Sequence, residues 1–300
     1  MTALPKRTLG RTGLEVTTLG FGAMEIRGPR IWGGRAVTDE QAKTILHAVL
    51  DSGINFIDTS NDYGRSEEFM GRFLAGRRKE YVLATKCGCK VTPAGDHDET
   101  PHEFTRANIE RGVEESLKRL KTECIDILQL HNPSVQQVKD GDVVRVLQDL
   151  QRAGKTRFIA ISSTLPHLPE FLALGVFDTF QIPYSALERE HEDLISKVAL
   201  AGAGAIVLGG VAQGSPAKEQ GRRWDAWQTS GLDTLRGGMS RQEFVLRYTM
   251  SHPALHTNIV GTLHPEHLAE NLAIVKKGPL PPDLYAETKK RLSVAGIKPA

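Results

Sequence analysis

Short apolar runs rich in β-branched residues alternate along the chain with longer stretches in which apolar residues recur every three or four positions. Short apolar runs of this kind are typical of buried strands, and the longer stretches are typical of amphipathic helices. The alternation predicts repeated βα units around a parallel sheet. Eight runs qualify as strands, at residues 18–23, 54–58, 81–86, 125–131, 157–162, 177–181, 205–208 and 258–260. Eight such strands close a barrel, so the predicted fold class is α/β, a (β/α)8 TIM barrel.

The opening of the chain lies outside this alternation. Residues 7–10 and 14–16 are strand-like and flank the turn sequence Arg11-Thr12-Gly13. We therefore expect an N-terminal β-hairpin before the barrel. No change of composition marks a linker, so residues 1–300 are expected to form one barrel domain.

Capping residues mark the expected helix starts. Thr38 and Gln41 form a capping-box sequence, and the sequence TPHE at residues 100–103 predicts a second one. Two connections, at residues 87–101 and 209–239, are too long to be simple turns. Both leave the C-terminal end of a predicted strand, where barrel enzymes build their sites.

Composition and charge then narrow the class of protein. The chain is 40% hydrophobic and 25% charged, and its 38 basic against 36 acidic residues give a net charge of +2, so nucleic acid and anionic membrane are poor candidates for its main partner. Without a targeting sequence or a run of about 18 apolar residues, the protein is expected to be cytoplasmic. Three cysteines without a secreted-protein spacing agree with a reducing compartment.

Four chemically active side chains follow the predicted strands. The second run ends in Asp58, the third in Lys86 and the fourth in His131, and Tyr63 lies five residues beyond Asp58. In a closed parallel barrel these strand ends meet at one mouth. A carboxylate, a phenol, an ammonium and an imidazole are therefore expected to form a proton-transfer site.

Elementary acid–base chemistry suggests a role for each group. A nearby ammonium stabilises a phenolate, so we expect Lys86 to lower the pKa of Tyr63, with Asp58 holding Lys86 charged and in place. His131 can orient a carbonyl oxygen that Tyr63 protonates. The accompanying hydride must come from a cofactor, because no side chain supplies one.

Several segments resemble those of a known family. FIDTSNDYG at residues 56–64, ATK at 84–86 and LQLH at 128–131 are similar to the catalytic segments of the aldo-keto reductases, and the likeness extends to GTLHPEHLAEN at 261–271. The resemblance implies NADPH-dependent, reversible reduction of an aldehyde or ketone to an alcohol, without a metal. It also implies that Asp58, Tyr63, Lys86 and His131 are the catalytic tetrad.

The resemblance further implies a set of cofactor contacts along the strand ends. At the nicotinamide it places Gly22 and Met24 beside the ring, Tyr184 stacked on the ring, and Ser162, Ser163 and Gln181 at the carboxamide. Around the pyrophosphate it places Leu208, Gly209, Gly210, Val211 and Gly214, and at the adenine Glu270 and Asn271. The other expected cofactor contacts are Asp58, Gly261, Thr262, Leu263 and His267. For Tyr184, packing in the core is an equally simple explanation.

Three positions depart from the family pattern. Ser163 stands where the family commonly has Asn, and Leu263 and His267 stand where it often has groups that hold the 2′-phosphate of NADPH. An aliphatic side chain cannot pair with a phosphate, whereas a protonated histidine can. NADPH is the expected cofactor, and NADH is the alternative.

Trp32 and a group of cysteines and histidines allow further hypotheses. Trp32 is predicted to line the substrate pocket with Tyr63 and His131, although a packed surface tryptophan fits the sequence as well. The sequence Cys87-Gly88-Cys89, with His97 and His102 nearby, could suggest zinc. The one-residue gap fits the usual zinc spacing badly, so no metal site is expected.

Two other functions remain open from the sequence. One is a cofactor-binding regulatory barrel, similar to the barrel subunits of potassium channels. The other is a barrel lyase or isomerase that uses Lys86 as a Schiff-base amine. The expected partner is a small carbonyl substrate, for which sugars, steroids, polyketides and simple aldehydes all fit, and the pattern sets no oligomeric state.

Overall fold

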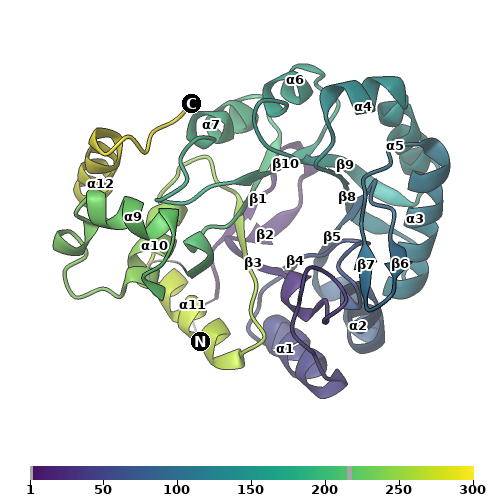
Figure 1. Ribbon diagram of the computed structural model, residues 1–300, viewed down its shortest axis with the longest axis horizontal. Coiled ribbons are helices and arrows are strands. Elements are labelled where there is room, and N and C mark those ends of the chain that lie inside the picture. Colours follow the sequence, from purple (N-terminus) through teal and green to yellow (C-terminus); the bar gives the residue numbers. More distant parts are fainter. Residues whose placement is uncertain (1–2, 215–217) are drawn as a thin grey trace.

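The computed structural model describes residues 3–214 and 218–300, and its centre is a closed barrel of parallel strands (Figure 1). Around the barrel the strands are β10 (Thr179–Pro183), β11 (Gly204–Leu208), β12 (Thr257–Val260), β3 (Leu19–Gly22), β4 (Phe56–Asp58), β5 (Val82–Cys87), β8 (Ile125–His131) and β9 (Thr156–Ser162). β9 pairs with β10 and closes the ring. Each strand overlaps one of the runs predicted from the sequence, so the predicted (β/α)8 barrel is confirmed.

Helices surround the barrel on its outside, as Figure 1 shows. They are α1 (Asp39–Asp51), α2 (Ser66–Phe73), α3 (Arg106–Leu120), α4 (Val135–Asp140), α5 (Val143–Arg152), α6 (Leu168–Ala173), α7 (Glu192–Leu200), α9 (Arg222–Thr229), α10 (Arg241–Met250), α11 (Pro265–Lys276) and α12 (Pro282–Val294). Their apolar faces pack on the outer faces of the strands. α3, for example, buries Ile109, Val113 and Leu117 in the same core cluster as Leu128 of β8.

The predicted N-terminal hairpin closes one end of the barrel. β1 (Lys6–Thr8) pairs with β2 (Glu15–Thr17) in antiparallel register around a short 3-10 turn. Leu9 and Val16 are fully buried against Phe56 and Ile127 from inside the barrel. Because the hairpin blocks the end where the strands begin, the opposite end is left as the mouth.

The two predicted helix starts have different outcomes. At α1, the Thr38 side chain accepts a hydrogen bond from the Gln41 amide in a complete capping box, as predicted. The prediction of a start at residues 100–103 is wrong. α3 begins at Arg106, and its cap is Thr105, which accepts from the Asn108 amide. Residues 100–103 instead remain in the connection, where His102 forms an isolated β-bridge with Cys89.

The long connection after β5 contains a second hairpin that the sequence analysis did not predict. β6 (Thr92–Ala94) pairs with β7 (His97–Glu99). Arg30 lies in the connection after β3. Its guanidinium donates to the Asp98 carboxylate at 2.9 Å, and the backbone carbonyl of Arg30 accepts from the backbone amide of Asp98 at 2.9 Å. These contacts join the hairpin to the loop after β3 at the mouth end of the barrel.

The long connection after β11 is the other predicted loop. It contains α9 and two short 3-10 turns, and residues 215–217 of it lie outside the described residues. Within 3–214 and 218–300, none of the helices combines the length and apolar character that a membrane crossing requires.

Candidate active site

The four predicted tetrad residues meet at the mouth of the barrel. Asp58 ends β4, Lys86 is the penultimate residue of β5 and His131 ends β8, while Tyr63 lies in the loop after β4. All four side chains are buried, with Tyr63 and His131 each 8% exposed. The Lys86 ammonium lies 4.8 Å from the centre of the Tyr63 ring, and the rings of Tyr63 and His131 meet edge to face at 6.1 Å.

Asp58 is the acceptor that organises the floor of this site. Its Oδ2 accepts from Lys86 Nζ at 2.6 Å, and its Oδ1 accepts from the side-chain amides of Gln129 and Gln181, each at 2.8 Å. Lys86 also donates to the carbonyl of Thr59 at 2.9 Å. A buried charge pair is costly unless its other donors and acceptors are hydrogen-bonded, and this network satisfies both Asp58 oxygens and two of the three Lys86 N–H groups.

Burial and charge act in opposite directions on Lys86. Burial, the largest single effect, lowers the pKa of this ammonium, but the interactions with Asp58 and Tyr63 together outweigh burial and raise the pKa above its usual value. Lys86 is therefore a cation at neutral pH. A Schiff-base lysine must attack as a neutral amine, so the structure disfavours the lyase alternative.

The predicted effect on Tyr63 needs a correction. Burial raises the pKa of Tyr63 to about 12, and the nearby Lys86 offsets only part of that rise. The sequence analysis expected a lowered pKa because it considered the ammonium and not the loss of solvent. The phenol thus stays protonated at neutral pH, and the nearby Lys86 charge would stabilise a phenolate if one formed.

Three residues surround Nδ1 of His131. Cys89 Sγ lies 3.0 Å from this nitrogen and Asp62 Oδ2 lies 3.4 Å from it. The ring of His102 stands edge to face with His131 at 5.5 Å. Burial would raise the pKa of Asp62, but the interaction with His131 lowers it to about 2, so Asp62 is a carboxylate. Since both close contacts involve Nδ1, Nε2 is the ring nitrogen available to a substrate.

Trp32, which the sequence analysis expects to line the substrate pocket, lies beside Tyr63. Its ring meets Tyr63 edge to face at 6.0 Å, and 52% of the residue is exposed. Its φ of 47° is left-handed, a conformation that non-glycine residues adopt at a cost. An aromatic face is thereby held at the edge of the mouth rather than packed in the core.

The strand ends between β11 and β3 carry three glycines, of which Gly22 leaves open space while Gly210 and Gly261 allow neighbouring segments to pack closely. Gly22 ends β3 with no neighbouring atom closer than 3.8 Å to the position of a Cβ. A Cβ on Gly261 would lie 2.7 Å from the Gly22 carbonyl, and one on Gly210 would lie 2.2 Å from the Asn258 side chain. Asn258 is fully buried, and neither polar atom of its side chain has a hydrogen-bond partner among the described residues. Glycine backbone and unpaired buried polar atoms are features that suit a closely held polar ligand.

Of the residues expected at the nicotinamide, Ser162 and Gln181 lie next to the tetrad. Ser162 donates to Gln181 Oε1 at 2.8 Å, which links both to Asp58, and Ser163 follows β9 and is buried. Tyr184 is fully buried against Tyr248 and His252. This burial is what core packing requires, and the contact of Tyr184 with the nicotinamide stays a prediction.

The remaining expected cofactor residues form an arc from β11 to α11. Met24 lies in the 3-10 turn η2 (Ala23–Ile26) after β3. Leu208 ends β11, Gly209, Gly210, Val211 and Gly214 follow it, Gly261, Thr262 and Leu263 follow β12, and His267, Glu270 and Asn271 belong to α11. Leu263 packs on the core, whereas His267 is exposed in the first turn of α11, with its ring 4.9 Å from that of His264.

Some neighbours of the tetrad had no role in the sequence analysis. Gln129 and Asp62 lie within the segments that carry the family likeness, but their types and spacing alone give no indication that they contact Asp58 and His131. Cys89 and His102 were considered with His97 as metal ligands. The structure brings Cys89 and His102 to His131 instead, and leaves His97 exposed on β7.

Comparison with known proteins agrees with this geometry. Residues 18–292 match the model of the aldo/keto reductase family. The chain is 35% identical over 194 residues to the aldo-keto reductase YhdN of Bacillus subtilis, an alignment that covers 63% of this chain and 56% of that relative. It is 27% identical over 301 residues to the L-galactose dehydrogenase of Arabidopsis thaliana, covering 92% of this chain and 89% of that one.

A solved structure extends the likeness to the whole barrel. The holo form of the aldo-keto reductase AKR11C1 from Bacillus halodurans superposes with a TM-score of 0.84 at 27% identity, and the match covers 96% of each chain. The family match spans most of the chain, including all eight strands of the barrel. The chain therefore belongs to the aldo/keto reductase family, whose members are NAD(P)H-dependent oxidoreductases that act on small carbonyl compounds.

Proposed function

We propose that the protein reduces an aldehyde or ketone to an alcohol, with Tyr63 as the general acid. The observation that carries this proposal is the position of the Lys86 ammonium, paired with Asp58 and 4.8 Å from the centre of the Tyr63 ring. A nicotinamide cofactor, when bound, supplies the hydride. The chain's own residues then have to bind the carbonyl, orient it and deliver one proton to its oxygen.

Tyr63 delivers that proton. With a pKa of about 12 it is protonated at neutral pH, and its hydroxyl proton passes to the carbonyl oxygen as negative charge develops there. The phenolate that results is stabilised by Lys86 and then regains a proton from solvent. In the oxidative direction the same phenolate accepts the proton of the alcohol.

Lys86 and Asp58 act through Tyr63. Asp58 keeps Lys86 charged despite complete burial, and the hydrogen bond to Thr59 fixes the position of the ammonium. The positive charge therefore lies near the phenolate before the reaction begins. Such preorganised charge in a buried site stabilises a transition state more than mobile charge in water does.

His131 orients the carbonyl from the other side. Cys89 and Asp62 hold its Nδ1, so Nε2 is directed away from them and is available to donate to the substrate oxygen. Two donors, Tyr63 and His131, would then converge on one oxygen. This convergence fixes which atom of the substrate accepts the proton.

The residues along the strand ends fit a dinucleotide. Gly22 leaves the backbone open to close approach, and Ser162 and Gln181 form a polar pair beside Asp58. We assign the nicotinamide to this pair and the pyrophosphate to the glycine-rich connection after β11.

For the far end of the cofactor we propose NADPH, with His267 contacting the 2′-phosphate. Leu263 packs on the core and is unsuited to that contact, whereas His267 lies in the exposed first turn of α11, where helix amides also favour an anion. NADH is the alternative, and it is favoured if His267 makes no phosphate contact.

Trp32 is the proposed wall of the substrate pocket. Its exposed ring beside Tyr63 offers an apolar face to whatever group flanks the carbonyl. The pocket thus favours a substrate with an apolar or ring-shaped face next to the reacting carbon.

A two-stage titration tests the proposal. NADPH and NADH are each titrated while quenching of tryptophan fluorescence is followed, and a panel of aldehydes and ketones is then added while cofactor oxidation is recorded. We expect NADPH to bind and be oxidised in the presence of a carbonyl compound. Failure to bind either cofactor would overturn the proposal.

The same experiment separates the two other functions. A regulatory barrel would bind the cofactor but turn over slowly without a partner, whereas fast turnover of a simple aldehyde by the isolated chain supports the reductase. Borohydride added with substrate would trap a covalent adduct on Lys86 in a Schiff-base enzyme. We expect no such adduct.

A further inference from the structure

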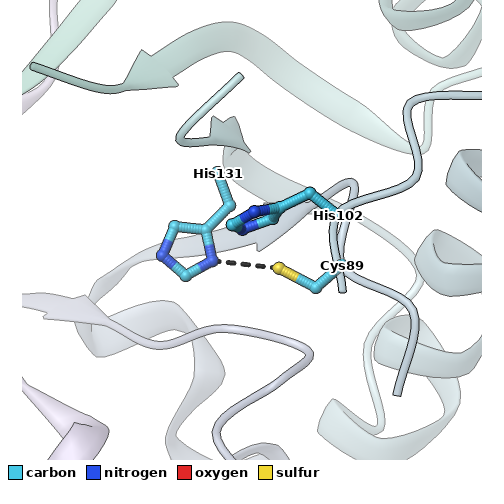
Figure 2. A group of neighbouring side chains, drawn as sticks. All are labelled: Cys89, His102 and His131. Carbon is cyan, nitrogen blue, oxygen red and sulfur yellow. Dashed lines mark hydrogen bonds between the residues drawn. The ribbon is translucent and has the colours of Figure 1, made fainter. Parts of the chain in front are cut away.

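Cys89, His102 and His131 meet at the mouth of the barrel (Figure 2). One ligand atom from each, the Cys89 sulfur and one ring nitrogen of each histidine, lies within 4.8 Å of the other two. His131 ends β8, while Cys89 and His102 lie on either side of the β6–β7 hairpin and are joined by an isolated β-bridge. Two separate parts of the fold therefore bring these groups together.

The donor set is of a particular chemical kind. One sulfur and two imidazole nitrogens are the ligands that zinc and similar late divalent metals prefer, whereas magnesium and calcium prefer oxygen. Sulfur and nitrogen ligands of a tetrahedral ion lie between about 3 and 4 Å from one another. The 3.0 Å between Cys89 Sγ and His131 Nδ1 lies at the lower end of this range, so small shifts of side chains would admit an ion.

The surroundings favour a cation as well. Asp62 is a buried carboxylate 3.4 Å from His131 Nδ1, and its charge together with that of a Cys89 thiolate would balance a divalent ion. Ser60 donates to the other oxygen of Asp62 and orients it, as outer groups do around bound metals. His102 is exposed, so an ion can reach the site from solvent.

We propose that Cys89, His102 and His131 bind one zinc-class divalent cation at the mouth of the barrel. Residue spacing alone argues against this site, because only two of its ligands are close along the chain and the third comes from β8. Binding replaces the Cys89 S–H bond with a sulfur–metal bond and releases that proton to solvent, and each histidine contributes a nitrogen lone pair. No group is oxidised or reduced.

Metal binding at this site would affect the proposed reaction. The ion would join Cys89 and His102 to Nδ1 of the imidazole that orients the carbonyl, and it would fix the position of that ring. We expect zinc to slow carbonyl reduction reversibly. This effect on turnover rests on the proposed function, whereas binding of the metal does not.

Cobalt provides a direct test because it replaces zinc and its absorption reports its ligands. The full-length protein, freed of metal with a chelator, is titrated with Co²⁺. We expect one equivalent to produce visible bands of a tetrahedral ion and a thiolate-to-cobalt charge-transfer band. Zn²⁺ should then abolish both by displacement.

Single substitutions test which side chains bind the ion. Cys89→Ser should remove the charge-transfer band, and His102→Ala should weaken cobalt affinity by at least about tenfold, since even groups outside the ligand set contribute this much. His102 is exposed, so its replacement leaves the fold intact, which circular dichroism checks. His97→Ala and Cys124→Ser are matched controls away from the cluster and should bind as the original chain does.

Three outcomes would overturn the proposal. They are the absence of a thiolate band at saturating Co²⁺, a band that persists in Cys89→Ser, and equal affinity in His102→Ala and His97→Ala. The proposed function fails separately, through the absence of cofactor oxidation in metal-free protein. If the metal-free enzyme is active and binds cobalt as described, zinc should inhibit it and a chelator should restore the rate, with His102→Ala resistant to the inhibition.

Discussion

The Lys86 ammonium lies 2.6 Å from the Asp58 carboxylate, and the two side chains are buried at the ends of neighbouring parallel strands. β4 and β5 pair with Asp58 opposite Ala84, so Lys86 lies two residues further along its strand and on the same face. The register of two strands thus sets the distance between the charges. The proposed acid, Tyr63, depends on this pair for its electrostatic environment.

Replacing Asp58 with Asn should destabilise the fold and reduce turnover together. The substitution leaves the Lys86 charge buried without its partner, which typically costs about 3–5 kcal/mol of unfolding free energy. Urea denaturation measures the loss. Asp51→Asn, which removes an exposed ion pair with Arg77, is the control and should cost less than about 1 kcal/mol. Equal stability of the two variants would show that the buried pair is not needed.

The two reaction directions should respond differently to pH. Reduction needs protonated Tyr63, and with a pKa of about 12 this form dominates up to pH 10. The titration of Tyr63 should therefore cause no change in the rate of reduction up to pH 10. Oxidation needs the phenolate, whose fraction rises about tenfold for each pH unit below the pKa. The rate of alcohol oxidation at saturating cofactor should therefore rise steadily between pH 7 and pH 10. A plateau near neutral pH would contradict the role of Tyr63 as the base.

His267→Ala should weaken NADPH binding and leave NADH binding unchanged. Loss of one charge-assisted contact to a phosphate corresponds to about a tenfold change in affinity. Fluorescence titration of both cofactors gives the ratio. His97→Ala, an exposed histidine on β7, is the control and should leave both affinities unchanged. If both cofactors lose affinity equally in His267→Ala, this histidine does not contact the 2′-phosphate.

Leu9→Ala should lower the unfolding free energy by about 2–5 kcal/mol. Leu9 is fully buried in the cluster that fills the barrel at its hairpin end, so truncation leaves a cavity there. Leu200→Ala is the control, since Leu200 is 88% exposed. Chemical denaturation compares the two, and a Leu9→Ala variant as stable as the control would mean that the hairpin is not part of the core.

The barrel could be predicted because its strands are buried on both faces. Runs such as IDILQLH at residues 125–131 are apolar and β-branched, and the helices between them carry a regular apolar face. The β6–β7 hairpin gives no such signal, because its residues are polar and largely exposed. A hydrophobic pattern indicates only the elements that are buried, so an exposed polar hairpin cannot be predicted from it.

The start of α3 shows a different limit. Residues 100–103 and 105–108 each begin with a threonine that could cap a helix. In the structure only the threonine at position 105 caps α3. The position of Phe104 helps to explain the choice, because its buried side chain packs in the core just before the cap. Tertiary packing thus decided between two locally similar caps.

The sequence was enough to predict which residues form the candidate site, but not the pKa of Tyr63 or the contacts of His131. Strand ends bring Asp58, Lys86 and His131 together by topology alone, so their positions follow from the barrel. The raised pKa of Tyr63 depends on how completely the surrounding loops bury it, and this depth is invisible in the sequence. The contact between Cys89 and His131 joins a loop to a distant strand, which spacing along the chain cannot indicate.

The most direct test of the proposed mechanism compares Tyr63→Phe with Tyr81→Phe. Both tyrosines are buried, but Tyr81 precedes β5 at the opposite end of the barrel from the tetrad. We predict that Tyr63→Phe binds NADPH with unchanged affinity and loses about 10²–10⁴-fold in the rate of carbonyl reduction, the usual contribution of a general acid, while Tyr81→Phe keeps its rate. A Tyr63→Phe variant that reduces the same carbonyl compound at the original rate would contradict the role of Tyr63.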